Sequence, residues 1–142
     1  YHSLIGINGR LDTLQAAVIL EKLTLLEKEI KMRNDVASKY DKLLSNSKVT
    51  TPFVSKDNVS CYAQYSILSD KRDKILKNFE NAGIPVSIFY PQPIYKQQAY
   101  KLKQKRLEIT EEVCQKIFSI PMHPYMRYQD QKYIANHILE CV

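Results

Sequence analysis

Two polar side chains near the start of the sequence, Asn8 and Arg10, are its strongest candidates for binding chemistry. They lie in the segment Gly-Ile-Asn-Gly-Arg at residues 6–10, and glycine permits backbone angles that other residues avoid. Short loops use such freedom to aim side chains at a ligand. The pattern predicts a ligand-binding loop, while an ordinary turn before a helix explains the same residues equally well.

Aromatic and histidine side chains are weaker candidates for a binding site. Tyr90 follows Phe89 at the end of a predicted strand, and its ring can stack while its hydroxyl donates a hydrogen bond. Both aromatic residues also suit a packed core. His123, next to Met122 and Pro124 at another strand end, could line a site, although a structural role is favoured. His2 and His137 are isolated in the sequence and are expected to be structural.

The sequence lacks the standard catalytic motifs. It has no phosphate-binding glycine loop ending in Lys-Ser or Lys-Thr, no Gly-x-Ser-x-Gly, and no cluster of histidine and cysteine with metal-ligand spacing. Cys61, Cys114 and Cys141 are far apart and odd in number, which predicts reduced thiols in a cytoplasmic protein. No metal site is expected.

The charge pattern argues against nucleic acid as a partner. The formal net charge is +6, yet lysine and arginine alternate with glutamate and aspartate along most of the chain, which is typical of solvated helix faces. The densest basic cluster, at residues 101–106, is expected to keep a loop hydrated. No apolar run approaches the ~20 residues that cross a bilayer, so no membrane partner is expected.

The elements that must position Asn8 and Arg10 begin with a long amphipathic segment. Residues 1–10 are expected to form a loop, and residues 11–45 one long helix or two helices that meet near residues 26–30. Asp12 can act as N-cap, with Gln15 reaching back as in a capping box. Because so long a helix exceeds a small domain, part of it should pack on another domain or subunit.

The remainder, residues 46–142, alternates strand and helix patterns. Gly83 is expected to cap a helix in the left-handed conformation, and the prolines of residues 91–95 impose a rigid connection. On the last helix, the predicted buried residues are Tyr133, Ile134, His137 or Ile138, and Cys141. The expected strands are 62–68, 84–90 and 118–124, and the expected helices are 71–82, 110–117 and 128–141. The predicted fold class is α/β (α+β), with a small sheet of about three strands covered by helices.

Seven separated motifs occur in order along the chain. They are Gly-Ile-Asn-Gly-Arg-Leu-Asp-Thr-Leu-Gln-Ala-Ala at 6–17, Arg33-Asn34, Arg72-Asp73, Gly83-Ile84-Pro85, Tyr90-Pro91-x-Pro93, Gln98-Ala99-Tyr100 and Ser119-Ile120-Pro121-Met122-His123-Pro124. Together they resemble the C-terminal part of the DegT/DnrJ/StrS family of sugar aminotransferases, over essentially all 142 residues. The first motif and the segment 63–65 are most similar to members that aminate a UDP-linked 3-keto sugar acid for surface polysaccharides, lipopolysaccharide among them.

The resemblance implies a fold type I aminotransferase, in which a large domain carries pyridoxal 5'-phosphate on a lysine and residues 1–142 form the small C-terminal domain. Such enzymes are homodimers with active sites at the interface, here through the loop 1–10 and the long helix 11–45. In the family, the residue equivalent to Asn8 contacts the cofactor phosphate of the neighbouring subunit. Arg10 is implied to hold the substrate carboxylate, since a guanidinium binds one bidentately. Tyr90 is implied to contact substrate, while Phe89 replaces a histidine of many relatives.

A non-enzymatic alternative also fits the basic charge and the long helix. The chain could be a regulatory or nucleic-acid-binding helical domain, which a steep salt dependence of DNA affinity would indicate. A helix-mediated dimerisation module is compatible with the enzyme hypothesis.

The family's cofactor-bearing lysine precedes the Gly-x-Asn-x-Arg motif, and no lysine of this sequence occupies that position. We therefore expect the 142-residue chain by itself to be inactive. Mixed with pyridoxal phosphate, glutamate and a nucleotide-linked keto sugar, it should form no cofactor–lysine adduct in the absorbance spectrum and transfer no amino group. Measurable turnover would contradict this expectation.

Overall fold

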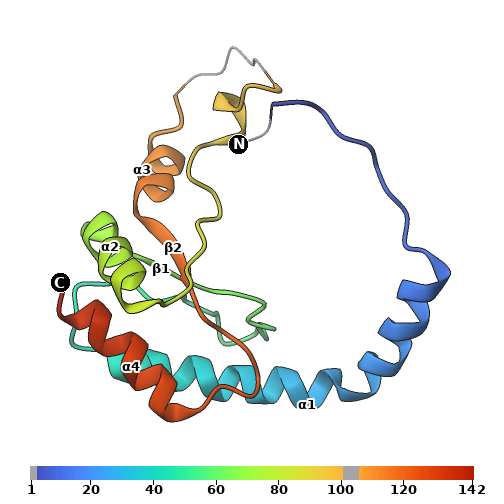
Figure 1. Cartoon of the computed structure of the whole chain (residues 1–142), viewed down its shortest axis with the longest axis horizontal. Helices are drawn as coiled ribbons and strands as arrows, with labels where there is room; N and C mark the ends of the chain where they lie inside the picture. Colours follow the sequence, from blue (N-terminus) through green and yellow to red (C-terminus); the bar gives the residue numbers. More distant parts are fainter. Residues whose placement is uncertain (1–2, 101–105) are drawn as a thin grey trace.

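A computed structural model describes residues 3–100 and 106–142 of the chain. These residues form an open arch, with a long helix along its base and the N-terminal segment crossing back toward residues 94–96 (Figure 1). The elements are α1 (Thr13–Leu44), β1 (Tyr65–Leu68), α2 (Arg72–Ala82), the short 3-10 helix η1 (Ile94–Lys96), α3 (Glu108–Lys116), β2 (Ile117–Ile120) and α4 (Tyr128–Leu139).

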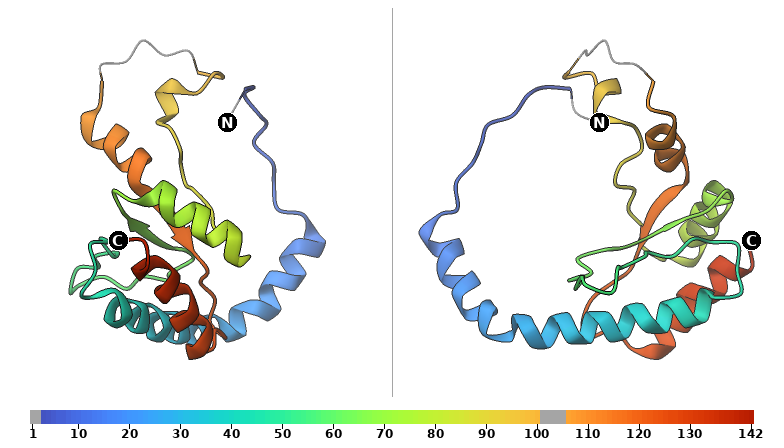
Figure 2. Two further views of the ribbon diagram at one scale, coloured as in Figure 1. Left: turned by 60° about the vertical axis from the view of Figure 1, so that its left-hand side comes forward. Right: turned by 180° about the vertical axis from the view of Figure 1, so that it is seen from behind.

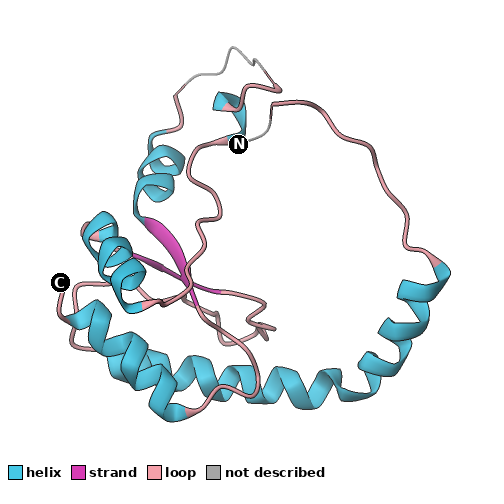
Figure 3. Ribbon diagram, viewed as in Figure 1, coloured by secondary structure: helices cyan, strands magenta, loops and turns pink. Residues whose placement is uncertain are grey.

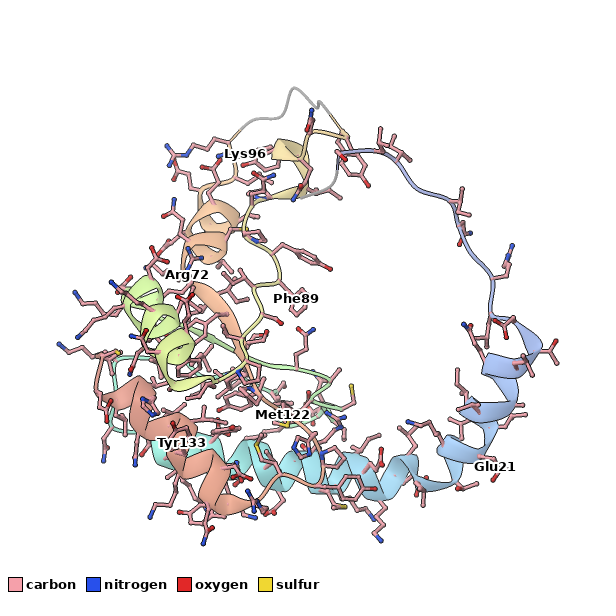
Figure 4. The ribbon with its side chains drawn as sticks, in the orientation of Figure 1. Glu21, Arg72, Phe89, Lys96, Met122 and Tyr133 are labelled. Atoms are coloured by element: carbon pink, nitrogen blue, oxygen red, sulfur yellow. The ribbon has the colours of Figure 1, made fainter. Side chains whose placement is uncertain are left out.

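The predicted N-terminal helical segment is one continuous helix, α1, rather than two. Asp12 caps it as predicted, because its Oδ1 accepts a hydrogen bond from the backbone N–H of Gln15 at 2.8 Å. The reciprocal bond from the Gln15 side chain is absent among the described residues. The first half of the helix bends (Figures 1 and 2), and Glu21 lies in this bent part (Figure 4). The Thr24 hydroxyl donates to the Glu21 carbonyl at 2.7 Å, a type of contact that bends helices.

Only the second half of α1 is buried by this chain. Its buried residues are Val36, Ala37, Tyr40 and Leu44. The large apolar residues of the first half are all exposed: Leu14, Val18, Ile19, Leu20, Leu23, Leu25 and Leu26. The expectation that this chain leaves part of the helix uncovered is confirmed, and the partner that covers it stays a prediction.

The sheet has two antiparallel strands, with Tyr65 opposite Ile120 and Leu68 opposite Ile117. Both strands were predicted, although each is shorter than expected. The predicted third strand at 84–90 is wrong: this segment pairs with β2 only through the isolated bridge of Ser87 with Ser119. Pro85 has no N–H to offer a ladder, and beyond the bridge Phe89 and Tyr90 turn outward into the proline-rich connection.

One face of the sheet carries the core. Tyr65 and Ile67 on β1 share this face with Phe118 and Ile120 on β2, as the strand period of two requires. The second half of α1 covers it through Tyr40, whose ring centroid lies 5.1 Å from that of Tyr65. On the same face α2 contributes Phe79, which meets Phe118 edge to face at 6.4 Å. Figure 3 shows the two strands against these helices.

The other helices largely follow the sequence pattern. Gly83 ends α2 with a left-handed φ of 66°, as predicted. Helix α3 begins at Glu108, slightly before the predicted start, and α4 ends at Leu139 rather than Cys141. Ile134, Ile138 and Cys141 are buried as expected, but the prediction for Tyr133 is wrong, since 51% of it is exposed. Its ring packs instead against His137, with centroids 4.6 Å apart.

Two of the sequence motifs, Arg33-Asn34 and Arg72-Asp73, have structural roles, because their side chains hold other segments of the chain. Arg33 Nη1 donates to the Tyr62 carbonyl at 3.0 Å and Asn34 Nδ2 to the Ser60 carbonyl at 2.9 Å. These bonds hold a loop in which Tyr62 has the strained φ of 41°. Arg72 Nη1 donates to the Cys114 carbonyl at 2.7 Å and so ties α2 to the C-terminal end of α3.

Phe118 lies at the centre of the core and is fully buried. We expect Phe118→Ala to lower the free energy of unfolding by about 3–5 kcal/mol, because it removes apolar burial and leaves a cavity. Urea denaturation should measure the loss. The matched control is Phe53→Ala, at a residue that is 91% exposed, for which we expect a change within about 0.5 kcal/mol. Equal losses in the two variants would contradict this assignment of the core.

Candidate functional site

The segment that carries Asn8 and Arg10 is extended and exposed throughout; Ile7, between them, is 97% exposed. Neither Asn8 nor Arg10 makes a hydrogen bond or ion pair with any residue in the described part of the chain. The loop is therefore not buried in its own globule, and both side chains are free to meet another molecule.

The glycines beside these residues do not act as predicted. Among the described glycines only Gly83 has a positive φ, so Gly6 and Gly9 do not use angles reserved for glycine. A Cβ built on either would meet no atom within 4 Å. The predicted aiming of Asn8 and Arg10 by glycine angles is wrong, because neither glycine has a positive φ and no described atom crowds its backbone.

Tyr90 lies elsewhere, at a cavity of about 630 Å³. Its ring meets that of Phe89 edge to face at 5.7 Å. Phe89 lies on the segment that follows the bridge at Ser87, on the inner side of the arch (Figure 4). The described residues that line this cavity come from three parts of the chain: residues 4–6, the segment 89–100, and the stretch from α3 to Ile117 at the start of β2. None of these lining residues is charged. Burial also raises the pKa of the Cys114 thiol at this cavity, which keeps the thiol neutral.

The structure therefore does not unite the predicted site residues within one chain. Tyr90 lines the cavity, whereas Asn8 and Arg10 do not. As it stands, the cavity suits an apolar or neutral polar group, because no cation among its described residues could pair with a phosphate or carboxylate.

Sequence reasoning missed a polar cluster centred on Glu111, next to this cavity. The Glu111 side chain is only 12% exposed. Its Oε1 accepts from the Tyr95 hydroxyl at 2.6 Å, and its Oε2 lies 2.9 Å from Lys96 Nζ and 3.3 Å from Arg106 Nε. The backbone N–H of Leu107 donates to the Tyr95 oxygen at 3.4 Å. No spacing rule joins these residues, so the sequence offered no signal for the cluster.

The cluster shifts the titration of its members in opposite directions. The hydrogen bond from Tyr95 is the main cause that holds the pKa of Glu111 below its ordinary value of 4.5, and the hydrogen bond from Lys96 is the second. The same bond raises the pKa of Tyr95, because losing its proton would place two negative oxygens together. Glu111 therefore stays ionised and Tyr95 stays protonated across neutral pH.

The two described histidines, His123 and His137, belong to no metal site of the described residues. His123 is exposed and lines neither the cavity of Tyr90 nor the two next best-formed cavities of the described residues. His137 is half-buried beside Tyr133, with its Nδ1 3.6 Å from a Glu140 oxygen, which supports a structural role. His2 and residues 101–105 of the basic cluster lie outside the described residues. Within residues 3–100 and 106–142, no group of histidine, cysteine and acidic side chains could hold a metal.

Six lysines and arginines of the described chain form ion pairs with acidic side chains. Lys39 bonds Asp35, Lys116 bonds Asp70 and Glu112, and Arg127 binds Asp130 through two nitrogens. Ion pairs of this kind are typical of solvated helix faces, whereas a nucleic-acid interface presents a cluster of basic side chains. No described helix has the length and apolar character needed to traverse a bilayer.

Comparison with known proteins places these features in context. Residues 1–139 match the DegT/DnrJ/EryC1/StrS aminotransferase family. The sequence is 40% identical, over 89% of this chain, to a UDP-2-acetamido-2-deoxy-3-oxo-D-glucuronate aminotransferase from Pseudomonas aeruginosa. It is 30% identical, over 99% of this chain, to a pleiotropic regulatory protein from Geobacillus stearothermophilus.

A solved structure of a protein from the same family is also similar to this chain. The crystal structure of a DegT DnrJ EryC1 StrS aminotransferase from Brucella abortus matches 94% of this chain with a TM-score of 0.84 and 42% identity. The chain spans 35% and 39% of the lengths of the two sequence relatives and 36% of the Brucella chain.

The Glu111 cluster predicts a measurable pH effect. A depressed folded-state pKa stabilises the fold at pH values above 4.5, and this contribution is lost as the pH falls through the folded value. NMR titration of the Glu111 carboxyl should give a pKa below 4.5, and Tyr95→Phe should raise it. Tyr100→Phe, at the same cavity but outside the cluster, should leave it unchanged. An unaltered Glu111 pKa in Tyr95→Phe would refute the proposed cause.

Proposed function

This chain belongs to the DegT/DnrJ/EryC1/StrS aminotransferase family, and from that premise we propose that it forms part of an enzyme that moves an amino group from glutamate to a UDP-linked keto sugar. The observation that carries the proposal is the family match over residues 1–139, which includes the exposed Asn8 and Arg10 and the cavity of Tyr90. The Pseudomonas relative, named for a 3-oxo-glucuronate substrate, supports a sugar acid. Synthesis of surface polysaccharide in the cytoplasm is the setting that we propose.

Arg10 would hold the carboxylate of the sugar acid. Its guanidinium is exposed and has no partner among the described residues, so no internal contact must be broken before a substrate binds. A guanidinium and a carboxylate form two parallel hydrogen bonds, which fix the orientation of the sugar as well as its place. The uncharged lining of the cavity beside Tyr90 cannot perform this task.

Pyridoxal phosphate is the cofactor that the family implies. The exposed amide of Asn8 fits a phosphate oxygen, because Nδ2 is a donor with no partner in the described chain. When bound, the cofactor would supply the electron sink that amino transfer requires. The residues of this chain would then hold its phosphate through Asn8, orient the sugar through Arg10, and bound the substrate through the ring and hydroxyl of Tyr90.

A second copy of the chain would complete the site. The loop 3–12 and the first half of α1 project together from the packed part of the chain and leave the apolar residues Leu14, Val18 and Leu23 exposed. Such a surface is typical of an interface. We propose a homodimer in which this loop and helix extend to the neighbouring subunit, so that Asn8 and Arg10 serve the partner's site while Tyr90 serves a site beside its own cavity.

The alternative of a nucleic-acid-binding domain receives less support. The Geobacillus relative carries a regulatory name, but Lys39, Lys116 and Arg127 of the described chain are paired with acidic groups, which is typical of solvated helix faces and not of a nucleic-acid interface.

The role of Arg10 can be tested in the holoenzyme. Arg10→Ala should raise KM for the sugar acid roughly 10- to 100-fold, because hydrogen bonds to a charged group contribute about 1.5–3 kcal/mol. Arg10→Lys should recover only part of the loss, since a single ammonium cannot pair bidentately. Pyridoxal phosphate content should stay normal in both variants.

Lys77→Ala is the matched control. It removes one exposed positive charge from α2 and should leave KM unchanged. Normal sugar kinetics in Arg10→Ala would remove the proposed role of Arg10, and an equal rise in Lys77→Ala would indicate an effect of net charge alone.

A further inference from the structure

The segment that carries Phe89 and Tyr90 is fastened at both ends to one continuous stretch of chain. This stretch, residues 107–119, passes from α3 directly into β2 without a connecting loop. Because β2 belongs to the sheet and Phe118 to the core, the stretch is a rigid support. The position of Phe89 and Tyr90 therefore depends on how the two fastenings are made.

The first fastening is the bridge between Ser87 and Ser119. The Ser87 N–H donates to the Ser119 carbonyl at 3.2 Å, and the Ser119 N–H donates back at 2.7 Å. This reciprocal pair uses backbone groups alone, so it depends little on side-chain identity.

The second fastening is the Glu111 cluster. Tyr95 and Lys96 belong to η1, and both bind the Glu111 carboxylate, one at each oxygen. The helix is too short to be stable by itself, and it is closed by the bond from the Gln97 N–H to the Ile94 carbonyl at 3.0 Å. Glu111 thus ties η1 to α3 through two contacts, and the bond from the Leu107 N–H to the Tyr95 oxygen adds a weaker one.

Between the two fastenings, Ile88 packs against the core and Gln92 Nε2 donates to Gln97 Oε1 at 3.1 Å, but neither contact involves the aromatic pair itself. Phe89 and Tyr90 make no hydrogen bond with the described residues, and Tyr90 is 60% exposed. Pro91 and Pro93 restrict the backbone that follows, so a displacement of η1 is transmitted to Tyr90 rather than absorbed. In Figure 4, Lys96 and Phe89 mark the two parts of this segment beside the arch.

We propose that Glu111 is a positioning residue, whose carboxylate holds η1 on α3 and thereby holds Tyr90 at the substrate cavity. The inference rests on the proposed function of Tyr90 as a substrate contact. A carboxylate is suited to this task because its two oxygens can accept from several donors at once. Glu111 binds Tyr95 and Lys96, which precede the segment 97–105, and Arg106, which follows it.

Glu111 also lies in the first turn of α3, where a negative charge stabilises the helix dipole. Glu108 shares that place, and Glu112 forms an ion pair with Lys116 on another side of the helix. Neither contacts η1. Glu108→Gln and Glu112→Gln are therefore matched controls for the helix-dipole effect and for the loss of an ion pair.

The test compares Glu111→Gln with these controls in the holoenzyme. Hydrogen exchange should become at least roughly 3-fold faster in residues 92–97 of Glu111→Gln, because local opening no longer breaks charge-assisted bonds. KM for the nucleotide sugar should rise roughly 10-fold, with pyridoxal phosphate content unchanged, since small displacements of a binding group are costly. Both controls should match the wild type in both measurements.

Tyr95→Phe is the second variant and keeps the test decisive if Glu111→Gln fails to fold. It removes the two hydrogen bonds that the Tyr95 hydroxyl makes, to Glu111 and from the Leu107 N–H, but leaves the ion pair of Lys96 with Glu111. It should therefore shift exchange and KM in the same direction by a smaller factor. Unchanged exchange in residues 92–97 of a folded Glu111 variant would overturn the proposal and leave the proposed function intact. Faster exchange with an unchanged KM would also overturn it, because Tyr90 would then not serve the substrate. A wild-type protein without transamination would instead contradict the proposed function.

Discussion

The packing of Tyr40 against Tyr65 is the interaction on which the rest of the structure depends. It joins the second half of α1 to the sheet, and both hydroxyls are satisfied: Tyr40 donates to the Pro121 carbonyl at 3.1 Å, and Tyr65 to Asp41. Burial raises the pKa of both phenols, with the neighbouring Asp41 adding to the effect at Tyr65, so they remain neutral donors. A buried hydroxyl without a partner would be costly, and these bonds therefore fix the angle of α1 on the sheet.

This anchoring at one end makes α1 a long projecting arm. Its second half is held by the core, while its first half and the preceding loop contact little of the described chain (Figure 2). Residues that stabilise the fold and residues available for binding are thus separated along a single helix. Asn8 and Arg10 can remain exposed and unpaired because the stability of the domain does not depend on them.

The aromatic pair at the cavity, Phe89 and Tyr90, lies on an irregular segment and not on a regular helix or strand. Its place is set by a backbone bridge at one end and a carboxylate cluster at the other. Proline keeps this segment out of the ladder and so leaves Phe89 and Tyr90 directed outward rather than into the core. The absence of a full third strand is thus what makes these side chains available to a ligand.

The sequence by itself determined the elements whose cause is local. Helical periodicity, the Asp12 cap and Gly83 located α1 and α2, and the ordered motifs identified the family. Only the tertiary structure decided which half of α1 is buried, whether residues 84–90 complete a strand, and which groups meet Glu111. These outcomes depend on contacts between residues far apart in sequence, such as Tyr95 with Glu111 or Ser87 with Ser119, and local propensity carries no information about such pairs.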